Sequence, residues 1–372
     1  MSALSAPSPY SQAKAEAVAG AAGAMVAPVR WPAVVPGSST GFGALREAGP
    51  TVRKAGPISM KRLELFRLAA PKDSGAHRYP GTVTDVLPPA PAPLPTTLAE
   101  ASEAGRTLIM GIINVTPDSF SDGGRWDTTD LAVAHGRQLR AQGADLLDVG
   151  GESTRPGAAR ITPATEQERI IPVVRALAAS GAVVSVDTVH AATAEAAVGA
   201  GAVIVNDVSG GLADPAMHGL IARTGVVYVC QHWRGDPETM DRLTDYPGGV
   251  VAGVEAELRE RLAELDAAGV DRSQVVLDPG LGFAKTHAQS WELLAATSRL
   301  IADLGRPLLV GSSRKRFLAQ AAEAEATPVQ RDAVTAATTA LAAAAGAWAV
   351  RVHEVPANRA AVRTASLWKE HQ

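Results

Sequence analysis

The run Leu108-Ile109-Met110-Gly111-Ile112-Ile113-Asn114 is short, apolar and closed by a polar residue, as is typical of a buried β-strand. A stretch of helical period follows at 130–143, and Asp145–Gly150 is the next apolar run. This alternation continues to the end of the chain. The other predicted strands are Val183–Asp187, Ala202–Asn206, Val226–Gln231, Gln274–Asp278, Pro307–Gly311 and Trp348–His353. The other predicted helices are 164–180, 190–200, 214–224, 248–269, 289–304, 332–346 and 357–369.

Eight strands that alternate with helices over about 260 residues have the count and size of a TIM barrel. We therefore expect an α/β protein with a (β/α)8 barrel over residues 106–369. A doubly wound open sheet is the alternative, but that fold rarely needs eight units and usually carries a glycine-rich first turn. No GxGxxG pattern follows the first predicted strand.

Residues 1–105 differ in composition from the predicted barrel. They hold more than half of the 25 prolines, and many of these lie in Val86–Pro95. Proline cannot donate a ladder hydrogen bond and favours extended polyproline. We expect a low-complexity Ala/Pro-rich extension that is mostly disordered. It is interpreted as a solvated tail, as the product of a start placed upstream of a native one at Met60, or as a transit peptide.

The composition excludes some classes of function. A net charge of -3 gives no reason to expect a nucleic-acid partner. No apolar run reaches the roughly 20 residues of a membrane helix, so no membrane association is expected. The only cysteine, Cys230, allows no intrachain disulfide and suits a cytoplasmic protein. A small-molecule substrate, including an anionic one, is compatible with these features.

Polar side chains close nearly all of the predicted strands. In a TIM barrel the carboxyl ends of the strands meet on the face that carries the active site. Any one such residue could be a buried hydrogen-bonded group or a helix cap. Their recurrence at equivalent positions indicates an active site. The residues are Asn114, Asp148, Asp187, Asn206, His232, Asp278, Ser312, Ser313, Arg351 and His353.

The types of these residues suggest two halves of one pocket. Asp187, Asn206 and Asp278 suit a flat heterocycle with several N–H donors. The cations and donors expected for a diphosphate or a carboxylate are Lys315, Arg351 and His353, with Arg155 and Arg314 nearby. Asn114 could place one oxygen on Mg²⁺, which keeps most of its waters and needs few protein ligands.

Two loops and one aromatic residue extend this pocket. Segments 114–124 and 150–157 are rich in Gly, Pro and small hydroxyl residues, and we expect them to act as mobile lids. Phe283 follows a strand end, where it could stack on a ring.

At these residues the chain resembles the dihydropteroate synthases of the folate pathway, most of all those of high-GC bacteria. The resemblance spans roughly 106–369. It rests on the order and spacing of several separate blocks. These are MGIINVTPDSFSDGG (110–124), DVGGESTRPGA (148–158), SVDT (185–188), NDVSGG (206–211), HWRG (232–235), DPGLGFAKT (278–286), SSRKRF (312–317) and RVHEV (351–355).

The resemblance implies an enzyme that joins 4-aminobenzoate to 6-hydroxymethyl-7,8-dihydropterin diphosphate, with Mg²⁺, and releases diphosphate. It also implies a homodimer and a sulfonamide target. By resemblance, the pterin is held by Asp187, Asn206, Asp278 and Lys315. Diphosphate and metal are held by Asn114, Arg351 and His353. The aminobenzoate is bordered by Thr154, Arg155, Pro156, Phe283 and Arg316. Catalytic roles fall to Asp118, Lys315 and Arg351, with Asp118 ordering the closed first loop.

The sequence departs from the family pattern at three places: Glu354 replaces an aspartate, Gln231 a methionine and Ser290 an asparagine. None of these is an assigned ligand of substrate or metal. Two other functions remain open. A methyltetrahydrofolate-dependent methyltransferase would share the pterin site, but it has no use for residues 312–317. A catalytically silent paralogue would be expected to lose Asp187, Lys315 or Arg351, which are all present.

Overall fold

The computed structural model describes residues 106–116, 128–152, 160–236, 238–323 and 326–372. The predicted extension, residues 1–105, lies outside these ranges, and so do most of the two predicted lid loops.

Eight parallel strands form one sheet in the order β6-β5-β4-β3-β2-β1-β8-β7. A single parallel bridge between Leu277 and Leu308 joins β6 to the start of β7, where the Leu277 amide donates to the Pro307 carbonyl at 2.9 Å. This contact brings the sheet close to a full barrel, as predicted. The strands are β1 Leu108–Asn114, β2 Leu146–Gly150, β3 Val184–Asp187, β4 Ile204–Asp207, β5 Val227–Gln231, β6 Val275–Asp278, β7 Leu309–Val310 and β8 Ala349–Val352.

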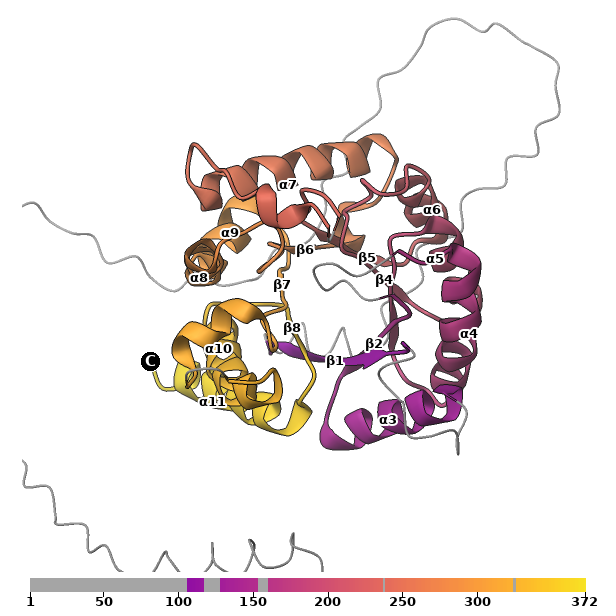
Figure 1. Ribbon diagram of the computed structural model, residues 1–372, viewed down its shortest axis with the longest axis horizontal. Coiled ribbons are helices and arrows are strands. Elements are labelled where there is room, and N and C mark those ends of the chain that lie inside the picture. The colour runs from indigo at the N-terminus through magenta and orange to yellow at the C-terminus, as the bar shows by residue number, and fades with distance from the viewer. Residues whose placement is uncertain (1–105, 117–127, 153–159, 237, 324–325) are drawn as a thin grey trace, which may run out of the picture. The chain divides into compact units, whose positions relative to one another are not determined.

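Helices surround these strands on the outside (Figure 1). They are α3 Thr128–Gln142, α4 Pro163–Ala179, α5 Ala191–Gly199, α6 Met217–Thr224, α7 Val250–Ala267, α8 His287–Ala295, α9 Thr297–Leu304, α10 Asp332–Ala344 and α11 Val355–Glu370. Short 3₁₀ turns are η1 Met240–Arg242, η2 Arg272–Gln274, η3 Arg316–Ala321 and η4 Val329–Arg331. In the described part of the chain, no helix combines the length and the apolar character that crossing a membrane requires.

Most predicted elements differ from the structure by one to three residues at an end, and two differences have a clear local cause. The predicted helix 289–304 is two helices, α8 and α9, that meet at Ala296. There the Thr297 hydroxyl donates to the Leu294 carbonyl at 2.7 Å, a local bond that competes with the helical ladder. The strand predicted over Pro307–Gly311 is shorter at both ends, and Pro307 has no N–H with which to extend the ladder.

The barrel interior has an apolar floor below the polar strand ends. Its cluster is Leu108, Met110, Leu146, Ile204, Val227, Val229, Val276, Leu309 and Ala349. Side chains two apart on a strand point to the same face, so the next inward position after each floor residue lies one layer higher. After Leu146 that position is Asp148, after Ile204 it is Asn206, and after Ala349 it is Arg351. The pleat of the strands therefore sets the polar site on top of a packed floor.

On the outer side of the sheet, a buried carboxylate fixes the end of β4. Asp207 accepts hydrogen bonds from the Tyr228 hydroxyl at 2.8 Å, the Ser209 hydroxyl at 2.7 Å and the Gly211 amide at 2.8 Å. Burial raises the pKa of Asp207, although these donors oppose the shift. Because Asp207 follows Asn206 in the chain, this cluster also positions the Asn206 backbone.

Replacing Tyr228 by Phe should lower the free energy of unfolding by about 1–3 kcal/mol, because buried Asp207 then loses one donor. Urea denaturation measures the change. Thr364→Ala, which removes an exposed hydroxyl on α11, is the control and should change stability by less than about 0.5 kcal/mol. Equal effects of the two substitutions would contradict this account.

Candidate active site

Four of the strand-end residues form one hydrogen-bonded group. Arg351 on β8 donates through Nε to Asp148 at 2.6 Å and through a terminal nitrogen to Asp187, also at 2.6 Å. The Asn206 amide donates to the same Asp148 oxygen at 2.9 Å. The structure thus brings together residues from β2, β3, β4 and β8 that are far apart in the sequence.

Asp148 is the member of this group whose position at a strand end was predicted without a role. Its side chain is fully buried, and one oxygen accepts from both Arg351 and Asn206. Its other oxygen, Oδ1, is buried and has no hydrogen-bond partner in the described part of the chain. The signal available in the sequence was its place at a strand end, and its partners follow only from the closed barrel.

Burial acts strongly on the ionisation of this group. It raises the pKa of Asp187 to about 7, although nearby Arg351 works against the shift. Burial disfavours the charge of Arg351 too, but Asp148 and Asp187 outweigh it and raise the pKa of the guanidinium. Arg351 is therefore a permanent cation, and Asp187 is the carboxylate that can change its charge near neutral pH.

Asp278, at the end of β6, lies at the start of a tight turn. The Gly280 amide donates to its Oδ1 at 2.7 Å, and Gly280 has a φ of +66°. A Cβ at this glycine would lie 2.4 Å from the His232 carbonyl oxygen, so a larger residue does not fit. Burial raises the pKa of Asp278, and the positive charge of Lys315 is the main opposing influence.

Lys315 contacts Phe283, although the two residues lie in different loops. Phe283 follows β6 and Lys315 follows β7. The Lys315 ammonium donates to the Leu281 carbonyl at 2.5 Å and lies 4.5 Å from the centre of the Phe283 ring. Burial lowers the pKa of Lys315 to about 8. Near neutral pH the Lys315 side chain can therefore donate hydrogen bonds, either as the neutral amine or as an ammonium that the Phe283 ring stabilises.

The remaining predicted ligands of the diphosphate have different surroundings. Asn114 ends β1 and is half-buried. The Nδ1 atom of His353 is 2.9 Å from the Ser313 hydroxyl. Arg314 forms two hydrogen bonds with Asp332 at the start of α10, at 2.7 and 2.8 Å. Like Arg351, it is thus held by a carboxylate.

The predicted border of the aminobenzoate is described only in part. Arg316 is exposed and forms an ion pair with Asp241 of η1 at 3.0 Å, so it lies at the rim and not among the buried groups. Asp118, Thr154, Arg155 and Pro156 lie outside the described residues. The start of the second loop is anchored at Gly151, because Arg169 donates to the Gly151 carbonyl at 2.9 Å.

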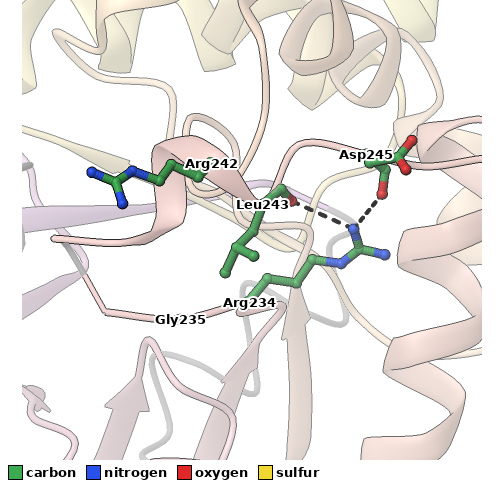
Figure 2. A pocket seen from close by; sticks show the side chains of 5 residues that line it. All are labelled: Arg234, Gly235, Arg242, Leu243 and Asp245. Carbon is green, nitrogen blue, oxygen red and sulfur yellow. Dashed lines mark hydrogen bonds between the residues drawn. The ribbon is translucent and has the colours of Figure 1, made fainter.

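A hollow of about 500 Å³ lies where the chain leaves β5 (Figure 2). It is lined by Arg234, Gly235, Arg242, Leu243 and Asp245, and by none of the strand-end carboxylates. The Arg234 guanidinium donates to the Asp245 carbonyl at 2.6 Å, as Figure 2 shows, and is therefore held in place. The hollow is distinct from the buried polar group.

Comparison with known proteins identifies the family to which the chain belongs. The family model for pterin binding enzymes matches residues 110–353. The chain is 50% identical over 266 residues to a dihydropteroate synthase of Mycobacterium leprae, which covers 70% of this chain and 93% of the relative. It is 41% identical over 293 residues to a dihydropteroate synthase of Synechocystis, covering 77% and 98%.

Solved structures give the same result. The dihydropteroate synthase of Xanthomonas albilineans with 4-aminobenzoic acid is 42% identical, with a TM-score of 0.66 over 72% of this chain and 93% of that one. The Yersinia pestis enzyme with a sulfonamide drug is 37% identical, with a TM-score of 0.66 over 71% and 95%. This chain therefore belongs to the dihydropteroate synthase family of pterin-binding enzymes.

Proposed function

We propose that the buried strand-end residues carry out the reaction of this family in the present chain. The reaction condenses 6-hydroxymethyl-7,8-dihydropterin diphosphate with 4-aminobenzoate to give 7,8-dihydropteroate and diphosphate in folate biosynthesis. The observation that carries this proposal is the joining of Asp148 and Asp187 by Arg351, beside Asn206 and above an apolar floor. The test is diphosphate release on mixing the two substrates, and no release on adding 4-aminobenzoate would contradict the proposal.

The pterin ring is held by acceptors and donors on the inner face. Asp278 has one oxygen engaged by the Gly280 amide, and no hydrogen bond within the described residues engages the other. Asp187 and Asn206 add a carboxylate and an amide, while Lys315 adds a donor. A ring with several N–H groups and ring acceptors finds partners in this set. A solved relative, the dihydropteroate synthase of Xanthomonas albilineans in complex with 7,8-dihydropteroate, supports a pterin as the class of ligand.

The diphosphate lies toward Arg351, His353 and Lys315. Asn114 would hold Mg²⁺ as a protein ligand, because magnesium takes few protein oxygens when phosphates and waters supply the rest. In the described part of the chain, no group of three or more His, Cys, Asp or Glu is arranged to hold a metal ion. When bound, the ion supplies charge neutralisation at the diphosphate oxygens.

The chemical step exchanges one bond for another. The bond between the pterin methylene carbon and the diphosphate oxygen breaks, and the electron pair leaves with diphosphate. The aminobenzoate nitrogen forms a new bond to that carbon and then passes one of its protons to water. Arg351 and Lys315 stabilise the negative charge that grows on the leaving group, and no covalent enzyme intermediate is needed. Thr154, Arg155, Pro156, Phe283 and Arg316 would border the aminobenzoate, and Asp118 would order the closed first loop.

Replacing Arg351 by Lys should lower kcat/KM by about 100-fold, because an ammonium cannot bridge Asp148 and Asp187 as the guanidinium does. Diphosphate release under saturating 4-aminobenzoate measures the change. Arg363→Lys, at an exposed position on α11, is the matched control and should retain wild-type kcat/KM. If Arg363→Lys lowered kcat/KM as much as Arg351→Lys does, the assay would report a loss of stability and not the role of Arg351.

The metal assignment makes a separate prediction. Asn114→Ala should raise the Mg²⁺ concentration needed for half-maximal rate by about tenfold, because one protein oxygen is lost from the ion. Titration of Mg²⁺ into chelator-treated enzyme measures this shift. An unchanged half-saturation point would contradict the role of Asn114 while leaving the reaction itself untouched.

We also propose a cytoplasmic homodimer. The lone, buried thiol of Cys230 supports the cytoplasmic location. The apolar surface of α10 and α11 supports the dimer. On that surface Leu341 is 64% exposed, Trp368 is 65% exposed and Leu367 is 50% exposed. Exposed large apolar side chains on neighbouring helices are typical of a face that another protein covers.

Introducing a charge into this face should separate the subunits. Leu341→Lys is expected to give a monomer by sedimentation velocity, since a buried unpaired ammonium opposes association. Leu212→Lys places the same charge at another exposed leucine, away from α10 and α11, and should leave the dimer intact. A wild-type protein that sediments as a monomer would refute the proposal directly.

A further inference from the structure

Lys285 is a buried cation that the proposed chemistry does not use. Its side chain follows the turn after Asp278 and is 7% exposed. The Nζ atom lies 3.0 Å from the Nδ1 atom of His232 and donates to the Phe283 carbonyl at 2.9 Å. The lysine therefore connects the end of β5 to the segment that carries Phe283.

The contacts continue outward from His232. Its Nε2 atom is 3.0 Å from Glu257 on α7, and Glu257 also accepts from Arg234 at 3.0 Å. Since Nδ1 accepts from the Lys285 ammonium, Nε2 carries the imidazole proton and donates it to Glu257. Burial and the neighbouring Lys285 lower the pKa of His232 to about 4, which agrees with a neutral ring in this role.

The segment that Lys285 holds has an unusual backbone. Gly280, Gly282 and Ala284 all have positive φ values, of 66°, 74° and 50°. Such a conformation is unfavourable for alanine, so surrounding contacts must maintain it. One is the Lys285 bond to the Phe283 carbonyl, and another comes from the Tyr246 hydroxyl, which donates to the Ala284 carbonyl at 3.2 Å.

The charges around Lys285 link it to the site. Asp278, Lys315, Glu257 and Arg234 act on its ionisation, together with the neutral His232 ring. Burial lowers the pKa of Lys285 to about 7, and Asp278 is the largest opposing influence. In return, Lys285 is one of the groups that hold the pKa of Asp278 down, with Lys315, the Gly280 amide and Arg351.

We propose that Lys285 is a positioning residue for the pterin site, whose ammonium holds the Pro279–Ala284 segment next to Asp278, and which His232 and Glu257 hold in place in turn. This inference rests on the proposed function, because it concerns the affinity of that site for the pterin substrate. The ammonium form exists below the pKa of Lys285 and is lost as the pH rises through it, so the support that it gives to Asp278 is strongest in acid.

The test is the KM for the pterin diphosphate in wild type and Lys285→Met, measured at about pH 6 and about pH 8.5 on either side of the lysine pKa. We expect KM to be raised about tenfold at the lower pH and about twofold at the higher pH, where the wild-type lysine is also neutral. The kcat should stay within about twofold of wild type, because the cations at the leaving diphosphate are retained. The KM for 4-aminobenzoate should rise as well, because Phe283 lies in the segment that Lys285 holds.

Glu257→Gln is a second variant, for the case in which Lys285→Met does not fold. Glu257 raises the pKa of Lys285, so its loss should neutralise the lysine at lower pH. We expect its KM for the pterin diphosphate to rise about threefold at about pH 7, with a smaller change at about pH 8.5. Arg175→Met, at an exposed position on α4, is the control and should keep the wild-type KM.

The outcomes separate the two proposals. Wild-type protein that forms no product refutes the proposed function. Active wild type with variants whose KM ratio is the same at both pH values refutes the role of Lys285, because a purely structural defect has no reason to follow the ionisation of one lysine. A loss confined to kcat refutes it as well.

Discussion

The polar interior of the barrel depends on the Arg351 guanidinium between Asp148 and Asp187. The two carboxylates lie on β2 and β3, whereas Arg351 reaches them from β8, with β1 between β8 and β2 in the sheet. Removal of one partner from a buried ion pair commonly costs about 3–5 kcal/mol, because it leaves an uncompensated charge. The three groups are therefore tied together, and Asn206 is oriented by sharing Asp148 with the arginine.

Much of the fold could be predicted because apolar residues recur in the sequence with the spacing typical of a helix or in the short runs typical of a buried strand. The strand ends at Asp187, Gln231 and Asp278 coincide with the predictions, since a buried parallel strand must stop where polar groups take over. The same reasoning placed Asn206 and Arg351 at one face. The local pattern did not show that α8 and α9 are separate helices, since that break comes from one hydroxyl bond at Thr297.

The partners of the long charged side chains could not be predicted. Arg314, Arg316 and Lys285 all lie in segments that the sequence marked as cationic or functional. Their partners are Asp332, Asp241 and His232, which come from other parts of the chain. A long side chain finds its partner only after the elements have packed, and burial then decides its charge. For this reason the sequence indicated which cations are near the site, but not which of them remain available to a ligand.

The apolar floor limits how ligands can reach the polar site. Leu108, Met110 and their neighbours close the barrel at the amino ends of the strands, so no route passes through it. A ligand of the polar group therefore reaches it from the opposite end, where the strands end at residues such as Asp187 and Asp278. A molecule bound deepest, next to the floor, would be enclosed by any molecule bound above it, so the closed floor sets an order of depth among ligands.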